Sequence, residues 1–372
     1  MGSKVGQILE ILARLAPPEL AAPWDRVGLL VGSPAQPVSK VAVALEASPA
    51  VLAGAAAAGA ELVLCHHPLF LQPPTQFAPE DYICQALALA LQHGLAVIAV
   101  HTNLDLAPGG LNDYLASCLG LTALQPLTVE TRDRWLKLTV FVPLGYEDRV
   151  REAVCQAGAG VIGSYTHCSF ATRGEGTYRP EEGAQPWRGT VHHLARAMES
   201  RLEVLLPASL SGPVLTALRT VHPYEEIAYD LYPLDNPGRP LGFGRIGCWS
   251  PPRPWSQVVQ FLKELFQIPY LRVVGRAPAI ISRVAVCGGS GGDLIKAAWE
   301  RGAQVFITGD LRYHQAVPWA SSDLAVVDVG HYASEVIFLS RWRQWLKEAF
   351  AAAALEVEVL DHHWDQDPFS FV

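Results

Sequence analysis

Two adjacent histidines, His66 and His67, directly follow the apolar run ELVLC. Short apolar runs of this kind are typical of buried strands, so the pair is expected where a strand ends. Imidazole nitrogens bind transition metals, but neighbouring side chains on a regular strand point in opposite directions. At a turn after the strand, each histidine could reach a different ion. Taken alone, the pair is more typical of a turn satisfied by hydrogen bonds.

Polar groups also follow three other predicted strands. LAVIAV is followed by His101, Thr102 and Asp105, QVFIT by Asp310, Tyr313 and His314, and LAVVDV by His331 and Glu335. In open α/β sheets, ligands bind beyond the carboxyl ends of the strands. Each group alone could simply cap a helix. Together they predict a metal site.

The spacing of His331 and Glu335 supports this prediction, because residues four apart lie on one face of a helix. The predicted ligands are His66, His67, Asp105, His331 and Glu335. Their mixture of nitrogen and oxygen suits Zn, Mn, Fe or Ni better than Ca or Mg. A carboxylate such as Glu335 could bridge two metals. We expect two divalent ions per chain, with zinc preferred over Mn, Fe or Ni.

An internal repeat indicates how these strands are organised. The matching segments are 38–48 with 281–290, 55–65 with 298–308, and 95–100 with 324–329. Each set alternates apolar strand-like runs with alanine-rich helical stretches, a pattern typical of a parallel sheet covered on both faces. We predict an α/β fold in which two related α/β halves, 1–130 and 245–372, form one sheet-based core.

Residues 131–244 have a different character. They contain a strand and an amphipathic helix, then a segment rich in glycine and proline, then strand, helix and strand again. The length suits a separate domain. We predict an α+β domain inserted between the two halves.

Composition limits the kind of protein this is. The chain has 372 residues, half of them hydrophobic, and a net charge of −8. Lysine and arginine are scattered, so nucleic acid is not an expected partner. The apolar windows are short or interrupted, and we expect no membrane span. Seven cysteines without CxxC spacing argue against a disulfide framework and predict a cytoplasmic protein.

Five motifs occur in order along the chain: WDRVGLLVG, CHHPLF, HTNLD, TGDLRYHQA and VDVGHYASE. Together they resemble the Nif-three-like dinuclear metal-centre family, whose members are often called GTP cyclohydrolase 1 type 2 homologues. The resemblance covers both halves. In the middle, GEGTYRPEEGAQPW and HPYEEIAYDLYPL are similar to the ferredoxin-like CutA and PII-like domain of longer bacterial members.

The resemblance implies the same five metal ligands. It implies that Glu335 bridges two ions, with His67 and Asp105 on one and His66 and His331 on the other. It also implies self-association into a ring-shaped homohexamer, with inserted domains that could form a homotrimer.

The predicted function is that of a metal-dependent hydrolase acting on a nucleotide or a related small molecule. Two divalent ions could activate water for such a reaction. We expect His101 and His314 to act as general acid or base, or to support the ligands. We expect Thr102 and Tyr313 to orient the substrate.

Two other functions remain open. The chain could be a non-catalytic metal-binding or regulatory module. Alternatively, GGSGG around Ser290 fits G-x-S-x-G between a strand and a helix, the context of a serine hydrolase nucleophile. The same loop could contact a substrate phosphate through Ser290 and its neighbouring backbone N–H groups.

Overall fold

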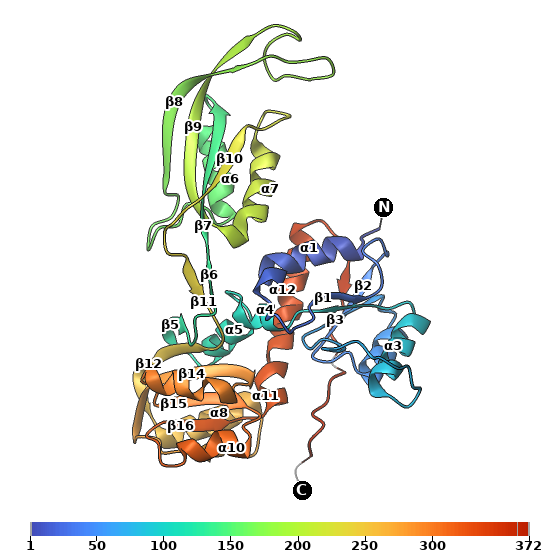
Figure 1. Ribbon diagram of the computed structural model, residues 1–372, viewed down its shortest axis with the longest axis vertical. Helices are drawn as coiled ribbons and strands as arrows, with labels where there is room; N and C mark the ends of the chain where they lie inside the picture. The colour runs from blue at the N-terminus through green and yellow to red at the C-terminus, as the bar shows by residue number, and fades with distance from the viewer. Residues whose placement is uncertain (1, 363, 371–372) are drawn as a thin grey trace. The chain divides into compact units, whose positions relative to one another are not determined.

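The computed structural model describes residues 2–362 and 364–370. The chain forms two compact units. Residues 1–130 and 241–372 make up the first, here called the core unit, and residues 131–240 make up the second, here called the middle unit (Figure 1). Both contain helices and sheets, which confirms the predicted α/β class.

The first sheet of the core unit has the strand order β1-β4-β3-β2-β17. Its strands are β1 (Gly28–Val31), β2 (Lys40–Ala44), β3 (Leu62–Cys65), β4 (Ala96–Ala99) and β17 (Glu358–Val359). Strands β2, β3 and β4 are parallel and fully buried apart from the first residue of β2. Burial of both faces explains why these strands are continuous apolar runs.

The second sheet repeats this arrangement. Its order is β13-β16-β15-β14-β12-β5. Its strands are β13 (Arg272–Val274), β16 (Ala325–Asp328), β15 (Val305–Gly309), β14 (Ile280–Ser290), β12 (Arg245–Pro254) and β5 (Thr122–Pro126). In both sheets three parallel strands have an antiparallel strand on one side, β13 here and β1 there. The other side differs, since β12 pairs antiparallel with β14, whereas β17 pairs parallel with β2. The sequence repeat therefore corresponds to a repeated topology.

The two halves exchange edge strands. Strand β5, from the first half of the chain, pairs with β12 in the second sheet. Strand β17, near the end of the chain, pairs with β2 in the first sheet. One hydrophobic cluster contains residues of both sheets, such as Val43 and Val286, together with the fully buried Trp342. Each half has its own sheet, and the two sheets share one core.

The helices of the core unit connect the strands. They are α1 (Val5–Leu15), α2 (Pro49–Ala57), α3 (Tyr82–Gln92), α4 (Thr102–Leu106), α5 (Leu111–Cys118), α8 (Trp255–Phe266), α9 (Ile295–Glu300), α10 (Tyr313–Ala316), α11 (His331–Val336) and α12 (Phe338–Ala352). Helix α2 begins at a favourable cap, since Ser48 accepts a hydrogen bond from the Val51 N–H. Helices α11 and α12 carry the chain from β16 to the first sheet (Figure 1).

The middle unit contains a four-stranded antiparallel sheet of order β10-β7-β9-β8. Its main elements are β7 (Trp135–Pro143), α6 (Glu147–Gln156), β8 (Ser169–Tyr178), β9 (Ala195–Pro207), α7 (Ser211–Val221) and β10 (Tyr229–Pro233). Two short strands, β6 (Thr131–Asp133) and β11 (Arg239–Leu241), pair with each other. Both helices pack on the sheet through apolar residues such as Val150 and Leu218. The kinship with CutA and PII-like domains stays a prediction.

Within residues 2–362 and 364–370, no helix combines the length and apolar character that crossing a membrane requires.

Candidate metal centre

The predicted ligands lie where strands of the core unit end. His66 and His67 follow β3, and Asp105 lies on α4 after β4. His331 and Glu335 lie on the short helix α11, after β16. Residues from both halves of the chain therefore meet at one place. The folded chain brings all five together.

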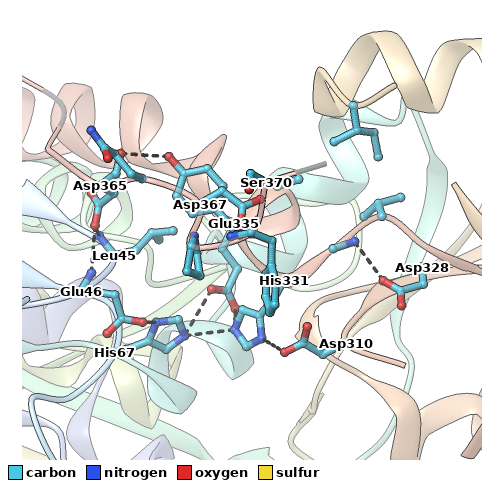
Figure 2. Close-up of a pocket in the computed structure, with 18 of the residues that line it drawn as sticks. Leu45, Glu46, His67, Asp310, Asp328, His331, Glu335, Asp365, Asp367 and Ser370 are labelled. Atoms are coloured by element: carbon cyan, nitrogen blue, oxygen red, sulfur yellow. Dashed lines mark hydrogen bonds and ion pairs between the residues drawn. The ribbon is translucent and has the colours of Figure 1, made fainter. Parts of the chain in front are cut away.

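His67, His331 and Glu335 form the first part of this cluster. The Glu335 carboxylate lies between the two rings, with Oε2 3.2 Å from His67 Nε2 and Oε1 3.2 Å from His331 Nε2. The two Nε2 atoms are 3.3 Å apart (Figure 2). These three side chains offer ligand atoms close enough together to hold one metal ion.

His66 and Asp105 form the second part. His66 Nε2 lies 3.6 Å from Asp105 Oδ1 and 3.8 Å from Glu335 Oε1, distances too long for hydrogen bonds. Both His66 Nε2 and Asp105 Oδ1 are buried, and neither has a hydrogen-bond partner among the described residues. Unpaired buried polar atoms cost free energy, whereas a metal ion between them would satisfy both. The donor set therefore fits a metal ion.

Each of the three histidines uses its other ring nitrogen to contact an oxygen. His66 Nδ1 lies 2.8 Å from the Val100 carbonyl, His67 Nδ1 2.7 Å from Glu46 Oε1, and His331 Nδ1 2.8 Å from Asp310 Oδ2. Such contacts orient metal-ligating histidines and make their free nitrogens better ligands. Three Nε2 atoms thus face the same space. This arrangement is typical of a metal site.

The protonation of the site shows how charges balance without a metal. Burial lowers the pKa of His66 to about 3, so this ring is neutral. Burial also disfavours charge on His67 and His331, but hydrogen bonds to carboxylates outweigh it and raise the pKa of His67 to about 11 and of His331 to about 9. Burial would raise the pKa of Glu335, yet these histidines hold it well below its usual value. Without a metal, the positive charges of protonated His67 and His331 therefore balance the negative charge of Glu335.

Asp105 behaves differently from Glu335. Burial, with the Glu335 charge adding to it, raises the pKa of Asp105 to about 7. Without a metal, too little positive charge lies near the Asp105 carboxyl group to keep it fully ionised at neutral pH.

The glycine-rich loop at 288–292 approaches the site closely. Gly289 has a φ of +64°, and a Cβ placed there would lie 2.4 Å from Glu335 Oε1 and 3.2 Å from His331 Nε2. Only glycine fits this position. The N–H groups of Gly288, Gly289 and Gly291 already donate to the side chains of Asn112, Ser334 and Thr308. This loop packs against the ligands and has few N–H groups left for a phosphate.

His101 lies beside the ligands, supported by Asp25. His101 Nδ1 is 2.9 Å from Asp25 Oδ1, and a ligand atom of His101 lies within 4.8 Å of those of His66 and His67. Burial favours the neutral acid at Asp25, but hydrogen bonds from His101 and Thr102 outweigh it and lower the pKa of Asp25 to about 2. The site thus has a fourth histidine with an ionised carboxylate partner.

The other predicted site residues do not join the ligand cluster. The Thr102 hydroxyl donates to Asp25 and accepts from the Ala22 N–H, and the residue is buried. Tyr313 and His314 are exposed on α10 and contact each other. Ser290 is exposed, and no hydrogen bond joins its hydroxyl to a histidine in the described part of the chain. The pairing that a serine hydrolase needs is not formed.

Sequence reasoning missed the carboxylates that support the histidines. Asp25 and Glu46 were not predicted to have this role, and Asp310 was noted only as the end of a strand. Glu46 follows β2 by two residues and Asp310 follows β15 directly. Both residues follow parallel strands at their carboxyl ends, as the predicted ligands do, and this position could have indicated their role.

A cavity of about 830 Å³ opens onto His67, His331 and Glu335 (Figure 2). Its wall includes the turns after β2 and β16 and the segments 268–272 and 365–370. Asp365 fixes part of this wall, since its Oδ1 accepts hydrogen bonds from the Leu45 and Glu46 N–H groups at 2.9 and 3.0 Å. The cavity is large enough for a small-molecule ligand.

Comparison with known proteins identifies the family. The chain is 36% identical over 365 residues to a protein of Halalkalibacterium halodurans named GTP cyclohydrolase 1 type 2 homolog, and the match covers 98% of each chain. It is 35% identical over 366 residues to a Bacillus subtilis protein of the same name, again covering 98% of each. The crystal structure of a Bacillus cereus protein related to NIF3 superposes with a TM-score of 0.81 at 36% identity, over 100% of both chains. Residues 3–368 match the Duf34/NIF3 (NGG1p interacting factor 3) family model, and this chain belongs to that family.

Proposed function

We propose that the core unit holds divalent metal ions at the cluster of His66, His67, Asp105, His331 and Glu335 and hydrolyses a small molecule in the adjoining cavity. The observation that carries this proposal is the convergence of three histidine Nε2 atoms on two carboxylates, with each Nδ1 held by an oxygen. The name that the relatives carry, GTP cyclohydrolase 1 type 2 homolog, agrees with a hydrolytic reaction on a ring.

The bound ions would lower the pKa of water and polarise the bond to be cleaved. The chain's own residues orient the participants. Glu335, buried and ionised between His67 and His331, keeps both rings facing the cavity. Gly289 leaves room for that carboxylate where any side chain would collide.

His101 is the proposed acid or base. Asp25 binds the ring at Nδ1, which leaves Nε2 to accept or return a proton beside the proposed ligands His66 and His67. Asp25 supports this acid or base role of His101, because an ionised carboxylate at Nδ1 fixes the tautomer of the ring and stabilises its protonated form. His314 belongs to neither donor group among the described residues, Tyr313 beside it is exposed, and we assign them no role.

We propose two ions per chain, with zinc as the preferred metal. The mixture of imidazole and carboxylate suits zinc. The cluster contains two groups of three donors that share His67, one with His66 and His101 and the other with His331 and Glu335. The shortest distances in the cluster, 3.2 Å, join Glu335 to His67 and to His331, and His66 lies 3.6 Å from Asp105. The division of ligands implied by the family resemblance stays a prediction, as do the hexameric or trimeric assembly and the cytoplasmic location.

The test compares the wild type with Glu335→Gln. Metal content is measured by elemental analysis, and turnover is measured on a panel of nucleotides, nucleosides and free bases. About two ions per chain, lost in the variant together with an activity, would support the proposal. Metal binding without turnover in the wild type would favour a non-catalytic metal-binding or regulatory module. A wild type that binds no metal would refute it.

A further inference from the structure

Trp24 is a large aromatic side chain that the fold leaves mostly open to solvent beside the metal centre. The residue is 59% exposed, although tryptophan is usually buried over most of its surface. Its ring centroid lies 6.0 Å from that of His101, with 74° between the two planes. In such an edge-to-face pair, His101 covers at most one face of the indole. The other face is therefore open to a ligand.

The backbone around Trp24 is held against the start of α4. The Ala22 N–H donates to Thr102 Oγ1 at 2.9 Å, and the Asp25 N–H donates to the Ala22 carbonyl at 2.9 Å. Asp25 Oδ2 accepts a hydrogen bond from the Thr102 N–H at 3.0 Å, and Asp25 Oδ1 lies 2.9 Å from His101 Nδ1. The place of Trp24 beside His101 is thus set before any ligand binds, which lowers the entropy cost of binding there.

A row of rings leads from Trp24 into the metal centre. The centroid of the His101 ring is 5.2 Å from that of His66 and 5.3 Å from that of His67. His67 also lines the cavity of about 830 Å³. A substrate that exchanges a proton with His101 must lie against that ring, and Trp24 is an aromatic surface directly beside it.

An open indole face favours one class of ligand. It stacks on flat unsaturated rings, and this contact tolerates different heterocycles because each of them has a π-face. A free sugar, an aliphatic acid or an inorganic anion has no such face. The position of Trp24 therefore favours a substrate that contains a flat ring.

We propose that Trp24 is a substrate-binding residue whose open indole face stacks on a heterocyclic ring and places it beside His101. The inference rests on the proposed function, which makes His101 the acid or base. Ring binding at Trp24 can be measured without turnover, so the two proposals can fail separately.

The first test observes Trp24 directly. The full chain is labelled with 5-fluorotryptophan and loaded with Zn²⁺, and its ¹⁹F NMR spectrum is recorded with guanosine, adenosine, cytidine or ribose. The chain has ten tryptophans, and Trp24→Phe identifies the Trp24 signal by its loss. The control is Trp299, which is 53% exposed and has a ring neighbour, Trp319, also at 6.0 Å.

We expect the Trp24 signal to shift with the nucleosides but not with ribose, while the Trp299 signal stays in place. A Trp24 signal that none of the nucleosides moves, or an equal shift at Trp299, would overturn the proposal.

The second test measures the strength of the contact. Trp24→Ala should weaken the binding of the nucleosides about tenfold, as the loss of a stacked aromatic side chain usually does. Trp24→Phe keeps a smaller ring and should restore most of the affinity, and Trp299→Ala should change nothing. Zinc content should be equal in all variants, since Trp24 is not a proposed ligand. Equal nucleoside affinities for wild type and Trp24→Ala would contradict the proposal.

Two other roles of Trp24 predict different results. If Trp24 only positions His101, Trp24→Ala lowers kcat on a turned-over substrate and leaves KM and nucleoside affinity unchanged. If Trp24 lies between copies of this chain, Trp24→Ala lowers the molar mass in sedimentation equilibrium, and nucleosides do not move the Trp24 signal. Either result overturns the proposal. Nucleoside binding at Trp24 without any turnover would count against the proposed function alone.

Discussion

Glu46 offers the sharpest test of how the metal centre is supported. Its carboxylate lies 2.7 Å from His67 Nδ1, on the side of the ring away from the ligand cluster. Glu46→Gln keeps an oxygen that can accept the hydrogen bond but removes the negative charge. We expect the metal affinity to fall, because the charge makes the opposite nitrogen a better ligand.

The size of the effect follows from the surroundings of Glu46. Carboxylates in this role usually contribute tenfold to a hundredfold in metal affinity. The Glu46 side chain is 54% exposed, so water screens its charge. We therefore expect a loss near the lower limit, about tenfold or about 1.4 kcal/mol.

The assay is competition for Zn²⁺ with a chromogenic chelator, with Glu61→Gln as the control. Glu61 accepts hydrogen bonds from the Ser39 and Lys40 N–H groups at the start of β2, whereas Glu46 follows the end of that strand. Glu61→Gln should lower the thermal stability without changing the metal affinity. Equal affinities for wild type and Glu46→Gln, or an equal loss in both variants, would refute the reasoning.

Three further predictions concern the same centre. Gly289→Ala should abolish metal binding at one or both positions, because its Cβ would collide with Glu335, and elemental analysis would show unchanged metal content if the close approach were unimportant. Asp365→Ala should weaken Zn²⁺ binding severalfold by freeing the backbone beside His67, while Asp365→Asn, which keeps an acceptor, should restore most of it. At about pH 7.5, metal binding should release more than one proton, because the raised pKa values of His67 and His331 leave both rings protonated without metal. Calorimetry in buffers of different ionisation enthalpy measures that release, and binding heats independent of the buffer would contradict it.

The fold was predictable because its signals are local. Apolar runs ending in polar residues marked the parallel strands, and the repeat marked the two halves. The exchange of β5 and β17 between the sheets was not predictable, since both are short and neither has a strong pattern. Which sheet an edge strand joins depends on the packing of the whole core.

The site was predictable as far as strand ends determine position. His66, His67 and Asp105 follow parallel strands on one edge, and their convergence is a consequence of the sheet. Closeness in sequence to a ligand or a strand end does not by itself predict that a side chain reaches the site. Thr102 is one residue from His101, yet its hydroxyl turns to Asp25 and a backbone N–H. His314 is four residues from Asp310, yet it is exposed.

The five proposed ligands come from both halves of the repeat. The first half supplies His66, His67 and Asp105, and the second supplies His331 and Glu335. Glu335 reaches His67 at 3.2 Å across this boundary. The exchanged strands β5 and β17 fix each half to the other's sheet, and α12 packs against β2 and β17. A shift of one half against the other would separate the proposed ligands, and the exchanged edge strands oppose such a shift.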